Sequence, residues 1–156
     1  MDKPAETLLF EFLEERIQSA AEGEIFHGLD LHDTIYQSIK KDSGIRISDA
    51  VGAFSPGAED EEKEYDVFIS LACFARVKGK DKNNRIPALI TAFLIQKAVY
   101  SLLRSDPTFG GRVCDSLLQR GARGYDEYDG EPFAVASVNL VINPSGERYA
   151  RSYYDN

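Results

Sequence analysis

The chain has 156 residues, of which 43% are hydrophobic and 28% are charged, and its formal net charge at pH 7 is −8. This length suits one domain with its own core, and the composition is typical of a globular protein. The negative charge argues against general binding of nucleic acid or of an anionic membrane, because both need lysine and arginine against phosphate groups. We therefore expect a single domain over residues 1–156 with a polar tail at 147–156, and neither a membrane nor sequence-specific nucleic acid as its partner.

Targeting and cysteine patterns indicate an intracellular protein. The longest apolar stretch, residues 86–103, contains Gln96 and Lys97, which argues against a transmembrane span. The first residues are charged and lead directly into an amphipathic pattern, so we expect no secretory signal. Cys73 and Cys114 lie in apolar surroundings without a CxxC spacing, which predicts reduced thiols buried in the core.

The first third of the chain predicts one long helix followed by short elements. Leucine and isoleucine recur every four residues between the N-cap candidate Asp2 and the terminating Gly23, as in an amphipathic helix. Residues 24–31 are then expected to be extended, residues 33–41 to form a short helix, and residues 45–47 a short strand. Runs this short do not distinguish helix from strand by periodicity.

The middle of the chain predicts a long strand at 65–77 and a second long helix that has Pro87 in its first turn and ends at Asp106. In the strand, apolar residues alternate with a set that is polar at both ends and apolar in the middle, as expected when both faces are covered. The helix is apolar on more than one side, so we expect both the sheet and a neighbour to bury it. The residues predicted to be core are Leu71, Leu89, Phe93 and Val99.

The last third predicts β-structure. Residues 113–118 alternate, residues 121–130 are rich in glycine and acidic residues and are expected to form a turn, and residues 133–142 form the final strand. The side chains expected to point inward from that strand are Ala134, Ala136, Val138, Leu140 and Ile142. The order of elements predicts an α+β fold, in which an antiparallel or mixed sheet is packed by two main helices.

Short motifs do not complete a catalytic or metal site. His27 and His32 lie near two aspartates, but the HExxH spacing is missing and the chain has no third histidine. In the acidic stretch 126–131, Gly130 is fifth instead of sixth, which departs from the calcium-loop pattern. A Cys/His pair is left open, since only geometry would identify one. We therefore predict no catalytic residue, no metal and no cofactor.

Two segments of opposite charge flank the predicted long strand. Residues 57–66 contain six acidic residues and one lysine, whereas residues 76–85 contain five basic residues and one aspartate. The twelve steps of the strand between them span about 40 Å at ~3.3 Å each. The segments are either solvated loops or the two ends of a protomer that associates head to tail. In the second interpretation the interface contains Glu59, Asp60, Glu61, Glu62, Lys78, Lys80, Lys82 and Arg85.

A short segment after the second predicted helix carries a family resemblance. It consists of Asp106, Thr108, Phe109, Gly110 and Gly111, and an alternating apolar strand follows at 134–142. A helix that ends in Asp-x-Thr-hydrophobic-Gly-Gly before such strands resembles the tail terminator, or tail completion, proteins of long-tailed bacteriophages. The resemblance covers roughly residues 65–143, and residues 7–21 loosely.

The resemblance implies a structural protein, not an enzyme, that forms a ring, usually of six copies, at the end of the tail tube. Its implied partners are itself, the tail tube protein and a head-completion or neck protein, in a virion tail assembled in the host cytoplasm. Asp106, Gly110 and Gly111 then join the assembly interface.

Other functions stay open. Residues 24–53 match no pattern of that family, which leaves another neck or minor tail protein as an alternative. A different class is an intracellular ligand-binding or regulatory α+β domain, which a deep pocket with convergent polar groups would favour. An enzyme of unrecognised type is the third.

Overall fold

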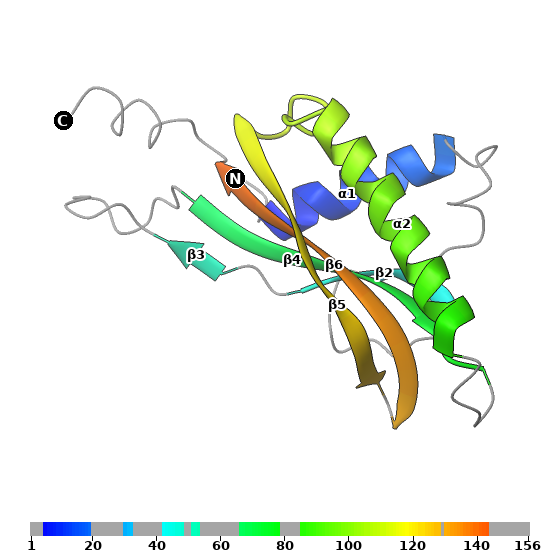
Figure 1. The fold of residues 1–156 in the computed structure, drawn as a ribbon. Helices are drawn as coiled ribbons and strands as arrows, with labels where there is room; N and C mark the ends of the chain where they lie inside the picture. Colours follow the sequence, from blue (N-terminus) through cyan, green and yellow to red (C-terminus); the bar gives the residue numbers. More distant parts are fainter. Residues whose placement is uncertain are drawn as a thin grey trace.

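Two helices pack on the same side of one sheet (Figure 1). The computed structural model of the chain describes residues 5–19, 30–32, 42–48, 51–53, 66–78, 85–128 and 130–143. The elements are α1 (Ala5–Ser19), β1 (Asp30–His32), β2 (Ser43–Ile47), β3 (Val51–Ala53), β4 (Asp66–Arg76), α2 (Arg85–Ser105), β5 (Asp115–Tyr128) and β6 (Glu131–Asn143). The predicted fold class, a single α+β domain, is confirmed.

The sheet is mixed, with β4 and β6 at its centre. Its strand order is β1-β2-β4-β6-β5, and β3 pairs with the beginning of β4. The β1–β2 pair is parallel and all the others are antiparallel. β4 and β6 pair continuously from Val67–Ile142 to Arg76–Phe133. Strand β5 is the edge next to β6, and its inward side is covered by α2.

The core lies between the helices and one face of the sheet. On that face β4 contributes Val67, Ile69, Leu71 and Cys73, all with at most 2% of their surface exposed. The residues predicted to point inward from the last strand are all buried as well. Burying one Leu, Ile or Phe side chain contributes roughly 1.5–3 kcal/mol, so this face dominates the stability of the fold. The helical residues in the same cluster are Leu9, Phe12 and Leu13 of α1 and Ile95, Val99 and Leu103 of α2.

Helix α2 is buried along one side only. The predicted core residues Leu71 and Val99 are fully buried, whereas Leu89 and Phe93 are half-buried, so their assignment to the core is corrected. Near its beginning α2 approaches the sheet through alanines, because small side chains permit close contact. By length and hydropathy alone α2 would suit a membrane span, contrary to the sequence interpretation of residues 86–103. The core helix of a soluble protein can have the same length and hydropathy. Only 33% of the apolar window is buried, which leaves much of the other side exposed.

The predicted turn at 121–130 is wrong, because most of it belongs to β5. The strand continues to Tyr128 and stays paired with β6, with a bulge between Arg120 and Arg123. Gly121 lies so close to β6 that a Cβ there would be 2.8 Å from Cβ of Ser137. Glycine in this stretch therefore permits close strand contact and does not end the strand. Of the predicted turn, the described residues leave only Gly130, with φ of 78°, outside the two strands.

The remaining expectations have mixed outcomes. The short strand predicted at 45–47 is confirmed within β2, and β1 overlaps the end of the segment expected to be extended. Cys73 is buried as predicted, but Cys114 is exposed, because it lies in the turn before β5 and not in the strand. The helix predicted at 33–41 and the tail at 147–156 lie outside the described residues.

Candidate functional site

The described residues offer no metal site. Among residues 5–19, 30–32, 42–48, 51–53, 66–78, 85–128 and 130–143, no group of three His, Cys, Asp or Glu side chains could hold an ion. His27 lies outside these ranges, as does the side chain of His32, so the histidine pair stays a sequence observation. Burial raises the pKa of Cys73 to about 12, so this thiol stays protonated at neutral pH and is a poor nucleophile.

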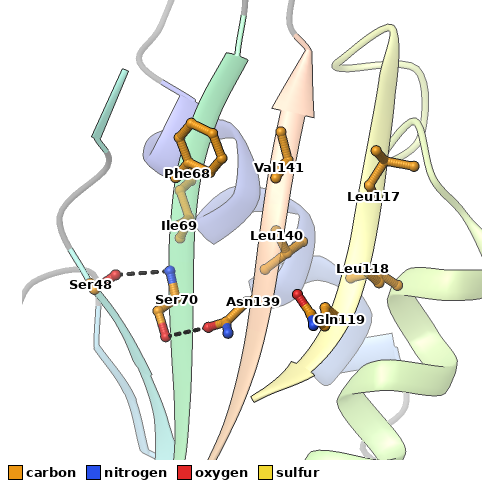
Figure 2. A pocket seen from close by; sticks show the side chains of 10 residues that line it. All are labelled: Ser48, Phe68, Ile69, Ser70, Leu117, Leu118, Gln119, Asn139, Leu140 and Val141. Atoms are coloured by element: carbon orange, nitrogen blue, oxygen red, sulfur yellow. Dashed lines mark hydrogen bonds between the residues drawn. The ribbon is translucent and has the colours of Figure 1, made fainter. Parts of the chain in front are cut away.

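A groove lies on the face of the sheet that points away from the helices (Figure 2). The pairings Phe68–Val141 and Leu117–Val141 place these three side chains on one face, opposite the core residues of β4. The groove has a volume of about 790 Å³. It is lined by Ser48, Phe68, Ile69, Ser70, Leu117, Leu118, Gln119, Asn139, Leu140 and Val141.

The groove is apolar at one end and carries uncharged polar groups at the other. Phe68 is 45% exposed and Leu117 is 56% exposed, and Val141 lies between them, so the three side chains form one apolar patch. The Ser70 hydroxyl donates to Oδ1 of Asn139 at 3.0 Å, and the Ser70 amide donates to Oγ of Ser48 at 2.9 Å (Figure 2). Since these polar groups bond to one another and none of the ten lining residues is charged, the groove suits an apolar surface better than a polar ligand.

The other end of the same face is closed by aromatic rings and arginines. Phe74 and Phe133 are buried and meet edge to face, with ring centroids 5.6 Å apart. The guanidinium of Arg76 lies 4.8 Å from the Phe133 ring centroid and pairs with carboxylates of Asp42 and Glu131. The open groove is therefore limited to the end of the sheet where β4 begins and β6 ends.

Helix α2 carries a second exposed apolar surface, which we call the α2 ridge. It consists of Ile86, Ile90 and Leu94, which are 61%, 55% and 47% exposed. Their spacing of four residues places them on one side of the helix. That side faces away from the alanines and aliphatic residues that pack on the sheet. The ridge and the groove thus lie on opposite sides of the molecule.

The Asp106 segment is an internal structural element. Oδ2 of Asp106 accepts hydrogen bonds from the Gly110 amide at 3.0 Å and from Arg16 of α1 at 3.1 Å. The hydrogen bond from Gly110 is the largest cause that holds the pKa of Asp106 below its usual value. Gly110 and Gly111 have φ of 69° and 86°, in the left-handed region that favours glycine. Phe109 is fully buried and stacks on Phe12 of α1. The motif therefore ties α1 to the end of α2.

The residues of the predicted charged interface are only partly described. Glu59, Asp60, Glu61, Glu62, Lys80 and Lys82 lie outside the described ranges. Strand β4, from Asp66 to Arg76, is slightly shorter than predicted, so the two charged segments leave its ends about 33 Å apart. Lys78 already pairs with Asp42 at 3.1 Å, and Arg85 is exposed at the first turn of α2.

Sequence reasoning missed the groove and its position. The sequence contained one signal. Phe68 alternates with the residues of β4 that face the core, and Leu117 is the neighbour of Leu118, so alternation along each strand places Phe68 and Leu117 on the opposite face. The pairing that brings them together through Val141 could not be read from the sequence, because it depends on β6 lying between β4 and β5.

Comparisons with known proteins add little. No protein-family model matches the chain, and no curated protein matches it. One of the solved structures that it resembles is a protein of no stated activity. The alignment covers 90% of this chain and 97% of that one, with a TM-score of 0.47 and 9% identity. A likeness of this degree says nothing about function. The observations that bear on function are the two exposed apolar surfaces, the groove and the α2 ridge.

Proposed function

We propose that the protein is a structural subunit of the tail terminator or tail completion type, which forms a ring of identical copies at the end of a phage tail tube. The observation that carries the proposal is the presence of two different exposed apolar surfaces, the groove and the α2 ridge, on opposite sides of the molecule. Exposed large apolar side chains that gather in one place usually mark a contact with another molecule.

Two unlike surfaces favour a head-to-tail contact between copies. When the ridge of one copy meets the groove of the next, each copy keeps a free ridge or groove for a further neighbour. Such an assembly closes into a ring when the rotations between neighbouring copies add up to a full turn, and the proposal requires this closure. The ridge, from Ile86 to Leu94, is about 12 Å long at 1.5 Å per residue. This apolar row matches in character the apolar end of the groove, where Phe68 and Leu117 are exposed. No cofactor is required for this role.

The phage assignment rests on the resemblance of the segment around Asp106. The hydrogen bonds that Asp106 accepts from Gly110 and Arg16 join α1, the end of α2 and the turn that follows it, which gives these residue types a structural role. In this proposal the further partners are the tail tube protein and a head-completion or neck protein. The site of action is the virion tail, after assembly in the host cytoplasm.

The test uses a polymerising tail tube protein, which the proposal expects to be encoded beside this chain. We expect the purified protein to sediment with the tubes, to shorten them, and to appear at one end of each tube by electron microscopy. The matched control is Leu117→Asp, which places a charge in the groove and should abolish ring formation without touching the core. If the parent neither binds the tubes nor changes their length, the terminator proposal is wrong. Saturable binding of a small apolar ligand in the groove would favour the ligand-binding alternative instead.

A further inference from the structure

Arginines stacked on aromatic rings follow the contact between α2 and the edge strand β5. The guanidinium carbon of Arg123 lies 3.7 Å from the ring centroid of Phe93. Those of Arg120 and Arg85 lie 4.9 Å and 5.4 Å from the ring centroids of Tyr100 and Tyr125. We call the surface formed by these six residues the arginine seam. It is distinct from the groove, because it lies at the sheet edge beside α2.

The bulge in β5 fixes the middle of the seam. The bulge lies opposite Ser137 of β6, whose carbonyl oxygen accepts a hydrogen bond of 2.7 Å from Nε2 of the buried Gln96. Oε1 of Gln96 in turn accepts a hydrogen bond of 3.3 Å from Nε of Arg123. The guanidinium is therefore held by its Nε and by the Phe93 ring. Its outer nitrogens have no partner among the described residues, and they keep the fork geometry that matches a carboxylate.

Some arginines in the described part of the chain have acidic partners, whereas the seam arginines have none. Arg16, Arg76 and Arg112 each pair with a carboxylate. Within the same described residues, Arg85, Arg120 and Arg123 form no ion pair, and all three are exposed. Lys97 adds one further exposed positive charge to α2. For a chain with a net charge of −8, this is a concentrated positive surface.

We propose that the arginine seam binds the acidic segment at residues 57–66 of a second copy of this chain. The proposal rests on the ring-forming function proposed above and names a contact within it. The segment has six acidic residues, and extended it measures about 30 Å, enough to follow a seam of about 20 Å. Charge complementarity across such a contact favours the correct neighbour and register.

The segment of the same copy is too short to follow the seam. Ala53 pairs with Asp66, so the twelve residues 54–65 leave and return at one point, and their tip reaches at most about 23 Å. The pairings of Tyr125 with Ala134 and of Ala134 with Ala75 place Tyr125 nine steps along β4 from Asp66. That separation is about 30 Å along the strands and about 10 Å across them. Arg120 is nearer, since its pairing through Val138 and Leu71 places it five steps from Asp66, so the same copy reaches at most that end of the seam. A second copy is needed to supply acids along the whole seam as far as Arg85.

At the basic end of β4, the described positive charges already have acidic partners. Lys78 pairs with Asp42, and Arg76 pairs with both Asp42 and Glu131, so these two charges are already neutralised within the chain. Arg85 belongs to both the predicted basic segment and the seam. Single-stranded nucleic acid also binds surfaces of arginine and aromatic residues, but the overall negative charge opposes it.

The test compares Arg120→Gln/Arg123→Gln with Arg104→Gln, an exposed arginine of α2 outside the seam. The full-length proteins are studied by sedimentation velocity at low and high salt. A fluorescent peptide of residues 57–66 and its all-amide form, with Gln and Asn for the acids, are titrated into each. We expect the double variant to weaken self-association and peptide binding about tenfold, since two charged contacts are lost, and Arg104→Gln to change them little. High salt should weaken both in the parent.

The possible outcomes distinguish the seam proposal from the ring-forming proposal. If the parent forms rings and the double variant forms the same rings and binds the peptide equally well, the seam proposal is wrong and the ring stands. If the parent stays monomeric but binds the acidic peptide and not the amide form, the ring proposal fails while the acidic preference of the seam holds. Tighter binding of a single-stranded oligonucleotide than of the peptide would overturn the proposal. Circular dichroism shows whether the double variant is folded. If it is not, titration of the parent with the acidic peptide and its amide form still tests the proposal.

Discussion

At the scale of single residues, Asp106 has a structural role that its sequence context only suggested. Its carboxylate accepts hydrogen bonds from the backbone of Gly110, from the hydroxyl of Thr108 and from Arg16. All three donors favour the ionised form, which lowers the pKa of Asp106 although partial burial opposes this. The carboxylate therefore stabilises the fold in a way that depends on pH.

We expect the parent to lose the contribution of Asp106 on acidification. The unfolded chain has the ordinary pKa of about 3.9, and the folded pKa is lower, so in between the unfolded state binds more protons. The stabilisation is complete above about pH 5 and disappears as the pH falls through the folded pKa. Asp106→Asn should cost about 1–2 kcal/mol at neutral pH and remove this part of the acid sensitivity. Urea unfolding of both proteins between about pH 7 and pH 3 measures it; parallel pH profiles would contradict the assignment.

At the scale of elements, β5 shows how a partner strand overrides local signals. Glycines and acidic residues between 121 and 128 favour a turn, yet this stretch pairs with β6 as far as Tyr128. Strand β6 is long and apolar. If β5 ended earlier, backbone N–H and C=O groups along the edge of β6 would lack hydrogen-bond partners. Gly121 is the position where the bulged strand comes nearest to Ser137.

Gly121→Ala is expected to destabilise the protein, whereas Gly124→Ala is not. The new Cβ at 121 would lie 2.8 Å from Cβ of Ser137 and 3.2 Å from its carbonyl oxygen, so the strands must separate. At 124 nothing lies within 4 Å, and the lower entropy of the unfolded chain makes alanine neutral or slightly favourable. The expected cost at 121 is about 1–3 kcal/mol, measured by urea unfolding. Equal stabilities of the two variants would show that the strand contact is looser than described.

At the scale of the whole molecule, the arrangement of layers decides which apolar residues are left for assembly. Both helices cover the same face of the sheet, so the other face stays open where β4 begins and β6 ends (Figure 1). Helix α2 has apolar residues around more than half of its circumference, and the sheet buries only one side. The same packing therefore creates the groove and the ridge.

Complementary variants test the head-to-tail contact. Ile90→Asp disables the ridge and keeps the groove, whereas Leu117→Asp disables the groove and keeps the ridge. We expect each variant alone to be monomeric and their equimolar mixture to form one-to-one dimers, because one intact ridge then meets one intact groove. Native mass spectrometry resolves these species. The control mixture of Ile90→Asp with Ile90→Asp/Leu117→Asp contains no ridge and should stay monomeric; rings formed by either single variant would contradict the model.

The sequence by itself determined the elements with strong periodicity. The two long helices, the long central strand and the inward side of the last strand follow from apolar spacing, because a residue's neighbours along one element suffice to set these patterns. The positive φ of Gly110 and Gly111 was also predictable, since glycine between a helix end and a strand marks a turn that other residues avoid.

Tertiary structure alone decided the course of β5, the half-exposure of Phe93 and the location of the groove and the arginine seam. Each depends on contacts between residues far apart in the chain: Gly121 against Ser137, Phe93 beneath Arg123, and Phe68 beside Val141. Local propensities of about 1 kcal/mol or less cannot outweigh a complete strand pairing, and no local pattern states which strand will lie between two others. For that reason the helices could be read from the sequence, while the groove and the arginine seam became visible only when β6 was placed between β4 and β5.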